Sequence, residues 1–209
     1  MRIAPRMLAG VALAGLIAAP VTAGAGQIYT ANLSPLNAGS HTVDGETYII
    51  PTTRGTATVT LRGDQVTVQT DVDGVTPETL HPQHIHAGLT CPNETDDVNA
   101  DGFVDVIEGL PKYGEILVSL DSSINDGAAS DLDFPFADEN GSFSYRAEGS
   151  RQHIQDEIQT ALKAGTRHVV IHGISPTGMP LPESVESLPG LPAWATLPVA
   201  CGELNLTSK

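Results

Sequence analysis

The stretch that decides the fold class reads Gly55-Thr-Ala-Thr-Val-Thr-Leu61, then Arg62-Gly63-Asp64, then Gln65-Val-Thr-Val-Gln69. In both halves apolar residues alternate with polar ones, which places the apolar side chains on one face of an extended strand. The three residues between the halves include a glycine, as tight turns between paired strands often do. The stretch therefore predicts a β-hairpin with one buried face.

Seven further short segments have strand-like composition and are separated by clusters of Gly, Pro, Asp and Asn. They are residues 28–33, 47–50, 84–87, 114–120, 141–147, 167–174 and 199–206. Short strands in this number predict an all-β sandwich or barrel of about eight strands. One helix is expected after Ser150, with Ile154, Ile158 and Leu162 on one face. The proline-rich residues 175–198 predict a long ordered loop.

The chain has 209 residues, 40% of them hydrophobic, and a formal net charge of −15. This acidity argues against a nucleic-acid partner. Arg2 and Arg6 precede an apolar run that ends in small residues, so residues 1–25 are predicted to be a signal peptide. The alternative, a membrane anchor, is disfavoured because the run is short for a span. We therefore expect one domain over residues 26–209, secreted or periplasmic, with no membrane span in the mature form.

Cysteine occurs at only two positions, Cys91 and Cys201, both within the expected mature chain. Export places them where disulfides persist, so we expect one bridge between them. A pair of free thiols, or a role as metal ligands, is the alternative.

Histidines form the most suggestive polar pattern. His84 and His86 lie two apart on an expected strand, so their rings point from one face and can bind one metal ion. His168 and His172 share a face of another strand but lie about 13 Å apart. One of these two would complete a three-imidazole site suited to copper or zinc. Ordinary surface or hydrogen-bonded histidines are the alternative.

Several patches resemble the copper/zinc superoxide dismutases. The run from Val66 to Pro77, with Leu80-His81 and His84-Ile-His86 after it, is similar to the region of that family that carries its paired copper histidines. Residues 166–172 are similar to the strand with the last copper histidine, and residues 197–202 to the segment with the second disulfide cysteine. The resemblance implies a Greek-key β-sandwich, copper at His84, His86 and His172, and superoxide as substrate.

The same resemblance implies that His81 is a buried structural histidine beside the copper site. His81, His168 and His41 are further candidate ligands. The family's zinc site and bridging histidine look absent, because only His153 and His168 lie between His86 and His172. Zinc is therefore not expected. Pro198 stands where the family has its superoxide-guiding arginine, and residues 173–200 contain no Lys or Arg. We expect poor electrostatic steering of an anion.

Residues 97–108 fit the twelve-position calcium loop of EF-hand proteins. The expected ligands are the side chains of Asp97, Asn99, Asp101, Asp105 and Glu108 and the backbone carbonyl of Phe103, with Gly102 at the sharp turn. Pro92 before the loop and Gly109 and Pro111 after it are expected to exclude the flanking helices. The loop would then brace the domain as zinc does elsewhere, and a merely solvated acidic loop is the alternative.

Two functions are compatible with the sequence. The first is an exported copper protein of superoxide-dismutase-like fold that also binds calcium, with superoxide dismutation as its candidate activity. The second is a non-enzymatic module that binds or stores copper, or a calcium-stabilised interaction module. Chordin-type domains, which the run His84-Ile-His-Ala-Gly88 also resembles, represent the latter class.

Overall fold

The computed structural model describes residues 26–125, 133–151 and 167–209 of the chain. The predicted signal peptide, the helix expected after Ser150 and His153 lie outside the described residues. The strands are β1 (Gln27–Pro35), β2 (Gly39–Val43), β3 (Glu46–Ile50), β4 (Arg54–Arg62), β5 (Gln65–Asp73), β6 (Gln83–His86), β7 (Ile116–Ser119), β8 (Ser142–Ser150), β9 (His168–His172), β10 (Pro198–Glu203) and β11 (Asn205–Ser208). The helices are the 3₁₀ turn η1 (Glu94–Asp96), α1 (Val106–Tyr113) and α4 (Ala193–Thr196).

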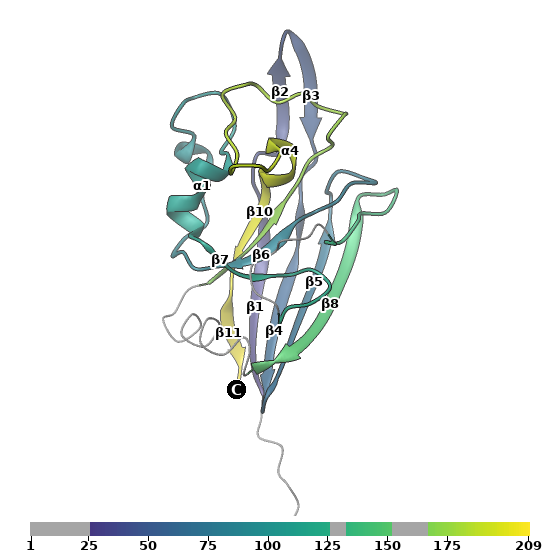
Figure 1. The fold of residues 1–209 in the computed structure, drawn as a ribbon, viewed down its shortest axis with the longest axis vertical. Coiled ribbons are helices and arrows are strands. Elements are labelled where there is room, and N and C mark those ends of the chain that lie inside the picture. The colour runs from purple at the N-terminus through teal and green to yellow at the C-terminus, as the bar shows by residue number, and fades with distance from the viewer. Residues whose placement is uncertain (1–25, 126–132, 152–166) are drawn as a thin grey trace, which may run out of the picture.

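A curled antiparallel sheet dominates the structure. Its strand order is β7-β6-β9-β10-β1-β4-β5-β8, with β11 paired to β1 beside this path and β2–β3 forming a separate hairpin. In Figure 1 the long strands run lengthwise, while α1, α4 and the β2–β3 hairpin lie toward one end and β11 toward the other. The expected all-β class is confirmed, as is the sandwich or barrel character of the sheet.

The hairpin predicted over residues 55–69 is β4–β5, and it contributes much of the hydrophobic core. Ala57, Val59 and Leu61 are buried on β4, and Val66 and Val68 are buried opposite them on β5. The residues between them in the chain face outward, as a period of two requires. Burial of one apolar face per strand is the main favourable contribution to folding here.

Strands β6 and β9 differ from β4 and β5, because every residue of both is buried. They pair antiparallel, with His84 opposite Val170. A buried polar link helps to hold β6: the Thr70 hydroxyl donates to the Gln83 amide oxygen, and the Gln83 amide nitrogen donates to the Leu120 carbonyl. Both strands are therefore buried along their whole length, and side chains on them are held in fixed positions.

Two sequence-based expectations need correction. Strand β2, which carries His41, was not expected, because this stretch shows no clear alternation. Helix α1 overturns the expectation that Gly109 and Pro111 exclude a helix after residues 97–108. On the other side of that segment the described structure has only the turn η1, so an entering α-helix is absent there, as expected.

Helix α1 forms despite its proline because its start is well capped. The Asp105 carboxylate accepts hydrogen bonds from the backbone N–H groups of Ile107 and Glu108. Pro111 removes only the hydrogen bond to the carbonyl four residues earlier, at partly exposed Ile107. Gly109 lies against the ring of Tyr113, and a Cβ at Gly109 would collide with that ring.

Candidate metal centre

Three histidines from two strands converge at one buried point. His84 and His86 project from β6, and His172 ends β9. One ligand nitrogen from each ring lies within 4.8 Å of the others, and all three side chains are buried. In the described part of the chain this is the one group of three or more His, Cys, Asp or Glu side chains that meets so closely. The group could hold a metal ion.

Backbone carbonyls fix how two of the rings face. The Nδ1 of His86 lies 2.8 Å from the carbonyl oxygen of Gly114, and the Nδ1 of His172 lies 2.8 Å from that of Thr196. A carbonyl only accepts, so both Nδ1 atoms carry the proton and both Nε2 atoms keep a free lone pair. Metal-binding histidines are commonly oriented in this way.

Three other ring nitrogens of these histidines have no hydrogen-bond partner. The Nδ1 of His84 and the Nε2 atoms of His86 and His172 are buried and make no hydrogen bond. Leaving such atoms unsatisfied in the interior costs about 1–3 kcal/mol each. Three of them at one point demand an explanation, and a shared metal ion provides one.

Burial also keeps the three rings neutral. It lowers the pKa of His86 to about 3 and that of His172 to about 4, because a charged imidazolium loses its hydration there. The pKa of His84 is likewise far below its usual value, first through burial and then through the neighbouring rings. Since metals bind the neutral imidazole, protons compete little for this site near neutral pH.

An apolar cavity of about 310 Å³ opens beside the three rings. Tyr113 of α1 packs edge-on against His86, with ring centroids 4.7 Å apart, and Phe134 packs against His84 at 5.2 Å. Leu188, Leu191 and Trp194, from the proline-rich residues 175–198, also line the cavity. No Asp, Glu, Lys or Arg in the described residues lines the cavity.

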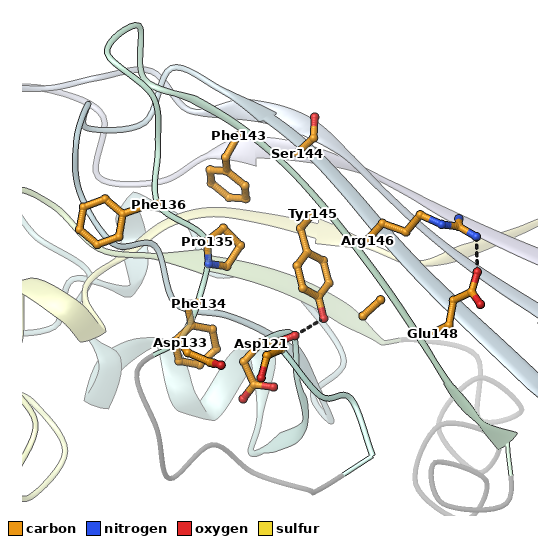
Figure 2. Close-up of a pocket in the computed structure, with 12 residues that line it drawn as sticks. Asp121, Asp133, Phe134, Pro135, Phe136, Phe143, Ser144, Tyr145, Arg146 and Glu148 are labelled. Atoms are coloured by element: carbon orange, nitrogen blue, oxygen red, sulfur yellow. Dashed lines mark hydrogen bonds and ion pairs between the residues drawn. The ribbon is translucent and has the colours of Figure 1, made fainter.

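A second, shallower groove of about 610 Å³ lies on the other side of Phe134. Figure 2 shows Phe134 beside Asp121 and Asp133, with the Tyr145 hydroxyl donating to the Asp121 carbonyl. The groove's single basic residue, Arg146, forms an ion pair with Glu148. Phe134 therefore separates an acidic outer groove from the apolar cavity at the histidines.

The other candidate histidines lie outside the three-ring group. Both ring nitrogens of His81 contact backbone carbonyls, those of His172 and Thr76, at 3.0 and 2.9 Å. The Nδ1 of His168 contacts the Gly88 carbonyl at 3.2 Å. His41 stacks on Phe103 in another part of the molecule. His81 thus braces the backbone of His172 from behind.

The acidic side chains of residues 97–108 bind the loop's own backbone. Asp97 accepts from the N–H groups of Asp101 and Gly102, and Glu108 accepts from those of Val98 and Asn99. Gly102 has φ of +92°, which the expected turn requires. In the described structure no three of these carboxylates meet as closely as the three imidazole nitrogens do.

This acidic loop is physically connected to the histidine cavity. The buried Asp105 carboxylate accepts from the N–H of Glu186, and the Asn99 amide donates to the Ser184 carbonyl, both in the proline-rich loop. Asp105 also begins α1, whose Val106, Leu110 and Tyr113 line the cavity. The loop over residues 97–108 therefore supports two walls of the cavity.

The expected disulfide is present between Cys91 and Cys201. It ties the segment after β6 to β10, next to Val170 of β9 and Tyr113 of α1. Such a bond is consistent with an extracellular or periplasmic location. Within the described residues, the helices are all too short or too polar to cross a membrane.

Comparison with known proteins adds no family assignment: no family model matches the chain, and no curated protein matches it significantly.

The three histidine ligands could be predicted from the sequence, but the residues that form the cavity wall could not. The apolar spacing of Val106, Leu110 and Tyr113 was a readable helical signal that Gly109 and Pro111 obscured. Phe134 carried no such signal, because it contacts His84 only through the fold.

Proposed function

We propose that this protein is an exported copper-binding protein whose ion is held by His84, His86 and His172. The observation that carries the proposal is the set of three buried, unpartnered ring nitrogens at one point. Imidazole nitrogens suit copper, and a bound copper ion supplies one-electron redox chemistry. The resemblance of residues 66–86, 166–172 and 197–202 to copper/zinc superoxide dismutases favours copper over zinc.

Export is part of the proposal. It is supported by the signal-peptide pattern of residues 1–25 and by the disulfide, which persists outside the reducing cytosol. Calcium binding by residues 97–108 is proposed as well, on the agreement of that stretch with the calcium-loop pattern. Its role would be to hold α1 and the proline-rich loop against the histidine cavity.

Superoxide is the substrate that the resemblance implies, but the cavity gives it little support. Superoxide is an anion, whereas no cationic side chain of the described residues lines the cavity and the neighbouring groove is acidic. An anion approaching this site would meet an unfavourable potential. We therefore propose copper binding as the function and treat dismutation as an activity to be measured on the same sample.

The test is metal analysis of the tag-free mature protein, followed by a competition titration with Cu(II) and Cu(I). We expect about one copper per chain. Replacing His172 by Ala should lower the affinity at least about a hundredfold, because one of three ligands is lost, while the His41→Ala control should retain it. Zinc in place of copper, or equal affinity in both variants, would contradict the proposal. Superoxide consumption that depends on His172 would add an enzymatic activity.

A further inference from the structure

The cavity beside the three histidines is larger than a metal ion and its water ligands require. Its volume is about 310 Å³, about twice that of an engineered apolar cavity that admits benzene. Small-molecule sites begin at about this size. The cavity therefore has room for an organic molecule of one or two rings next to the metal ligands.

The hydroxyl groups in the cavity wall are already satisfied by the protein. The Tyr113 hydroxyl donates to the Val106 carbonyl, and the Thr196 hydroxyl bonds to Ser187. The Thr196 carbonyl accepts from His172. Among the side chains of the described lining residues, the imidazole nitrogens of the metal-free site and the indole N–H of Trp194 are left to meet a polar group of a ligand.

The rest of the wall offers hydrocarbon and aromatic surface. It includes the side chains of Leu110, Ile116, Leu188, Leu191 and Trp194. In the metal-free protein, a carboxylate, phosphate or ammonium group placed here would lose its hydration without gaining a partner of opposite charge, which is costly. A neutral molecule with a hydrocarbon body would instead bury apolar surface.

We propose that this cavity binds a neutral organic molecule with a hydrocarbon body and one hydroxyl-type polar head, an alcohol or a phenol. The head faces His84, His86 and His172, and the body packs against Leu188, Leu191 and Trp194. The inference deepens the proposed function, since the ligand would lie beside the proposed copper ion. It names the class of molecule that the protein wall of the cavity favours beside this ion.

The experiment uses the full mature chain, first free of metal and then loaded with copper. Trp194 is the only tryptophan in the chain, so its fluorescence reports on the cavity wall alone. The probes are cyclohexanol, which is neutral, and cyclohexanecarboxylate, which has the same ring and a negative charge. Both are transparent where tryptophan is excited, and calorimetry gives a second measure of binding.

In the metal-free protein, we expect cyclohexanol to shift the Trp194 emission saturably and to bind at least about tenfold more tightly than the carboxylate, because desolvation of the charged probe is far more costly. Leu191→Asp places a charge at the cavity wall on a partly exposed residue, so it should abolish binding without unfolding the chain. The control is Leu206→Asp on β11, a leucine of similar exposure outside the cavity, which should bind as the wild type does.

Equal or tighter binding of the carboxylate, no binding of cyclohexanol, or unchanged binding in Leu191→Asp would each overturn the inference. The metal-free titration separates this result from the proposed function. Copper binding without cyclohexanol binding would leave the copper proposal standing and overturn the ligand. In the copper-loaded protein, cyclohexanol should change the Cu(II) paramagnetic resonance spectrum, and an unchanged spectrum at saturation would place the probe away from the metal and overturn the stated orientation.

Discussion

The Nδ1–H of His172 donates to the carbonyl oxygen of Thr196 at 2.8 Å, which ties the last residue of β9 to the last residue of α4. His86 makes the equivalent bond to Gly114, directly after α1. Each ring is therefore oriented by the segment that forms a wall of the cavity. The ligand geometry and the cavity cannot change independently.

The bond between His86 and Gly114 can be tested at the glycine. Gly114 has φ of +75°, and a Cβ there would collide with the backbone of Gly88. We expect Gly114→Ala to lower the free energy of unfolding by about 1–3 kcal/mol and the copper affinity about tenfold, because the carbonyl must move away from His86. Denaturant melts and copper competition measure the two effects.

The control for that variant is Gly63→Ala in the β4–β5 turn. Gly63 also has a positive φ, of +57°, but a Cβ there would meet no atom within 4 Å. Gly63→Ala should lower the free energy of unfolding by about 1 kcal/mol through backbone strain and leave copper affinity unchanged. A similar loss of copper affinity in both variants would show that the effect is general and not transmitted through His86.

The disulfide is expected to contribute strongly to stability. It joins residues 110 positions apart, and chain-entropy arguments assign a loop of that length about 5 kcal/mol. The double variant Cys91→Ser/Cys201→Ser should lose about this amount in urea unfolding, and reduction of the wild type should cause the same loss. A loss of unfolding free energy below about 1 kcal/mol would contradict this, because it would mean that removing the disulfide adds little conformational entropy to the unfolded chain.

Acid should destabilise the metal-free protein through its buried histidines. The folded-state pKa of His86 is about 3 and that of His172 about 4, against about 6.5 when unfolded. Between these values the unfolded chain binds protons that the folded chain does not, so stability is full above pH 6.5 and falls toward pH 3–4. Each ring contributes about 1.4 kcal/mol per pH unit in this window.

The measurement is the free energy of unfolding at several pH values between 4 and 7, for the metal-free wild type and for His86→Leu. Removing one titrating ring should make the pH dependence shallower by about 1.4 kcal/mol per pH unit. Identical slopes would show that these rings do not carry the acid sensitivity.

Calcium should stabilise the protein through Glu108. Calcium at a hundred times its dissociation constant adds about 2.7 kcal/mol to the stability of a protein that binds it only when folded. In Glu108→Gln this increment should vanish. The chelator-treated variant should melt somewhat below the chelator-treated wild type, because the single amide oxygen can accept from Val98 and Asn99 but the NH2 group cannot accept from the N–H of Asp105. The control Glu183→Gln, an exposed acid outside the loop, should keep the increment. Melting curves with calcium, magnesium and chelator check this.

The β4–β5 hairpin could be predicted because its evidence is local. Alternation of Val59 and Leu61 with threonines reports which face is buried, and that property does not depend on distant residues. The bridge between Cys91 and Cys201 was predictable for a different reason, since the chain has two cysteines and they allow one pairing within it. Helix α1 was missed because Gly109 and Pro111 oppose a helix locally, while the Asp105 cap and the packing of Tyr113 outweigh them.

The sequence showed that His84 and His86 share a face, because the alternation of a strand is a property of neighbouring residues. It left open which of His168 and His172 joins them. That choice depends on how β9 pairs with β6, which sets His168 opposite His86 and turns its Nδ1 to the Gly88 carbonyl, while His172 reaches the other two rings. The apolar cavity likewise arises only when α1, Phe134 and the proline-rich loop meet, because contacts between segments far apart in the chain are settled by packing and not by local pattern.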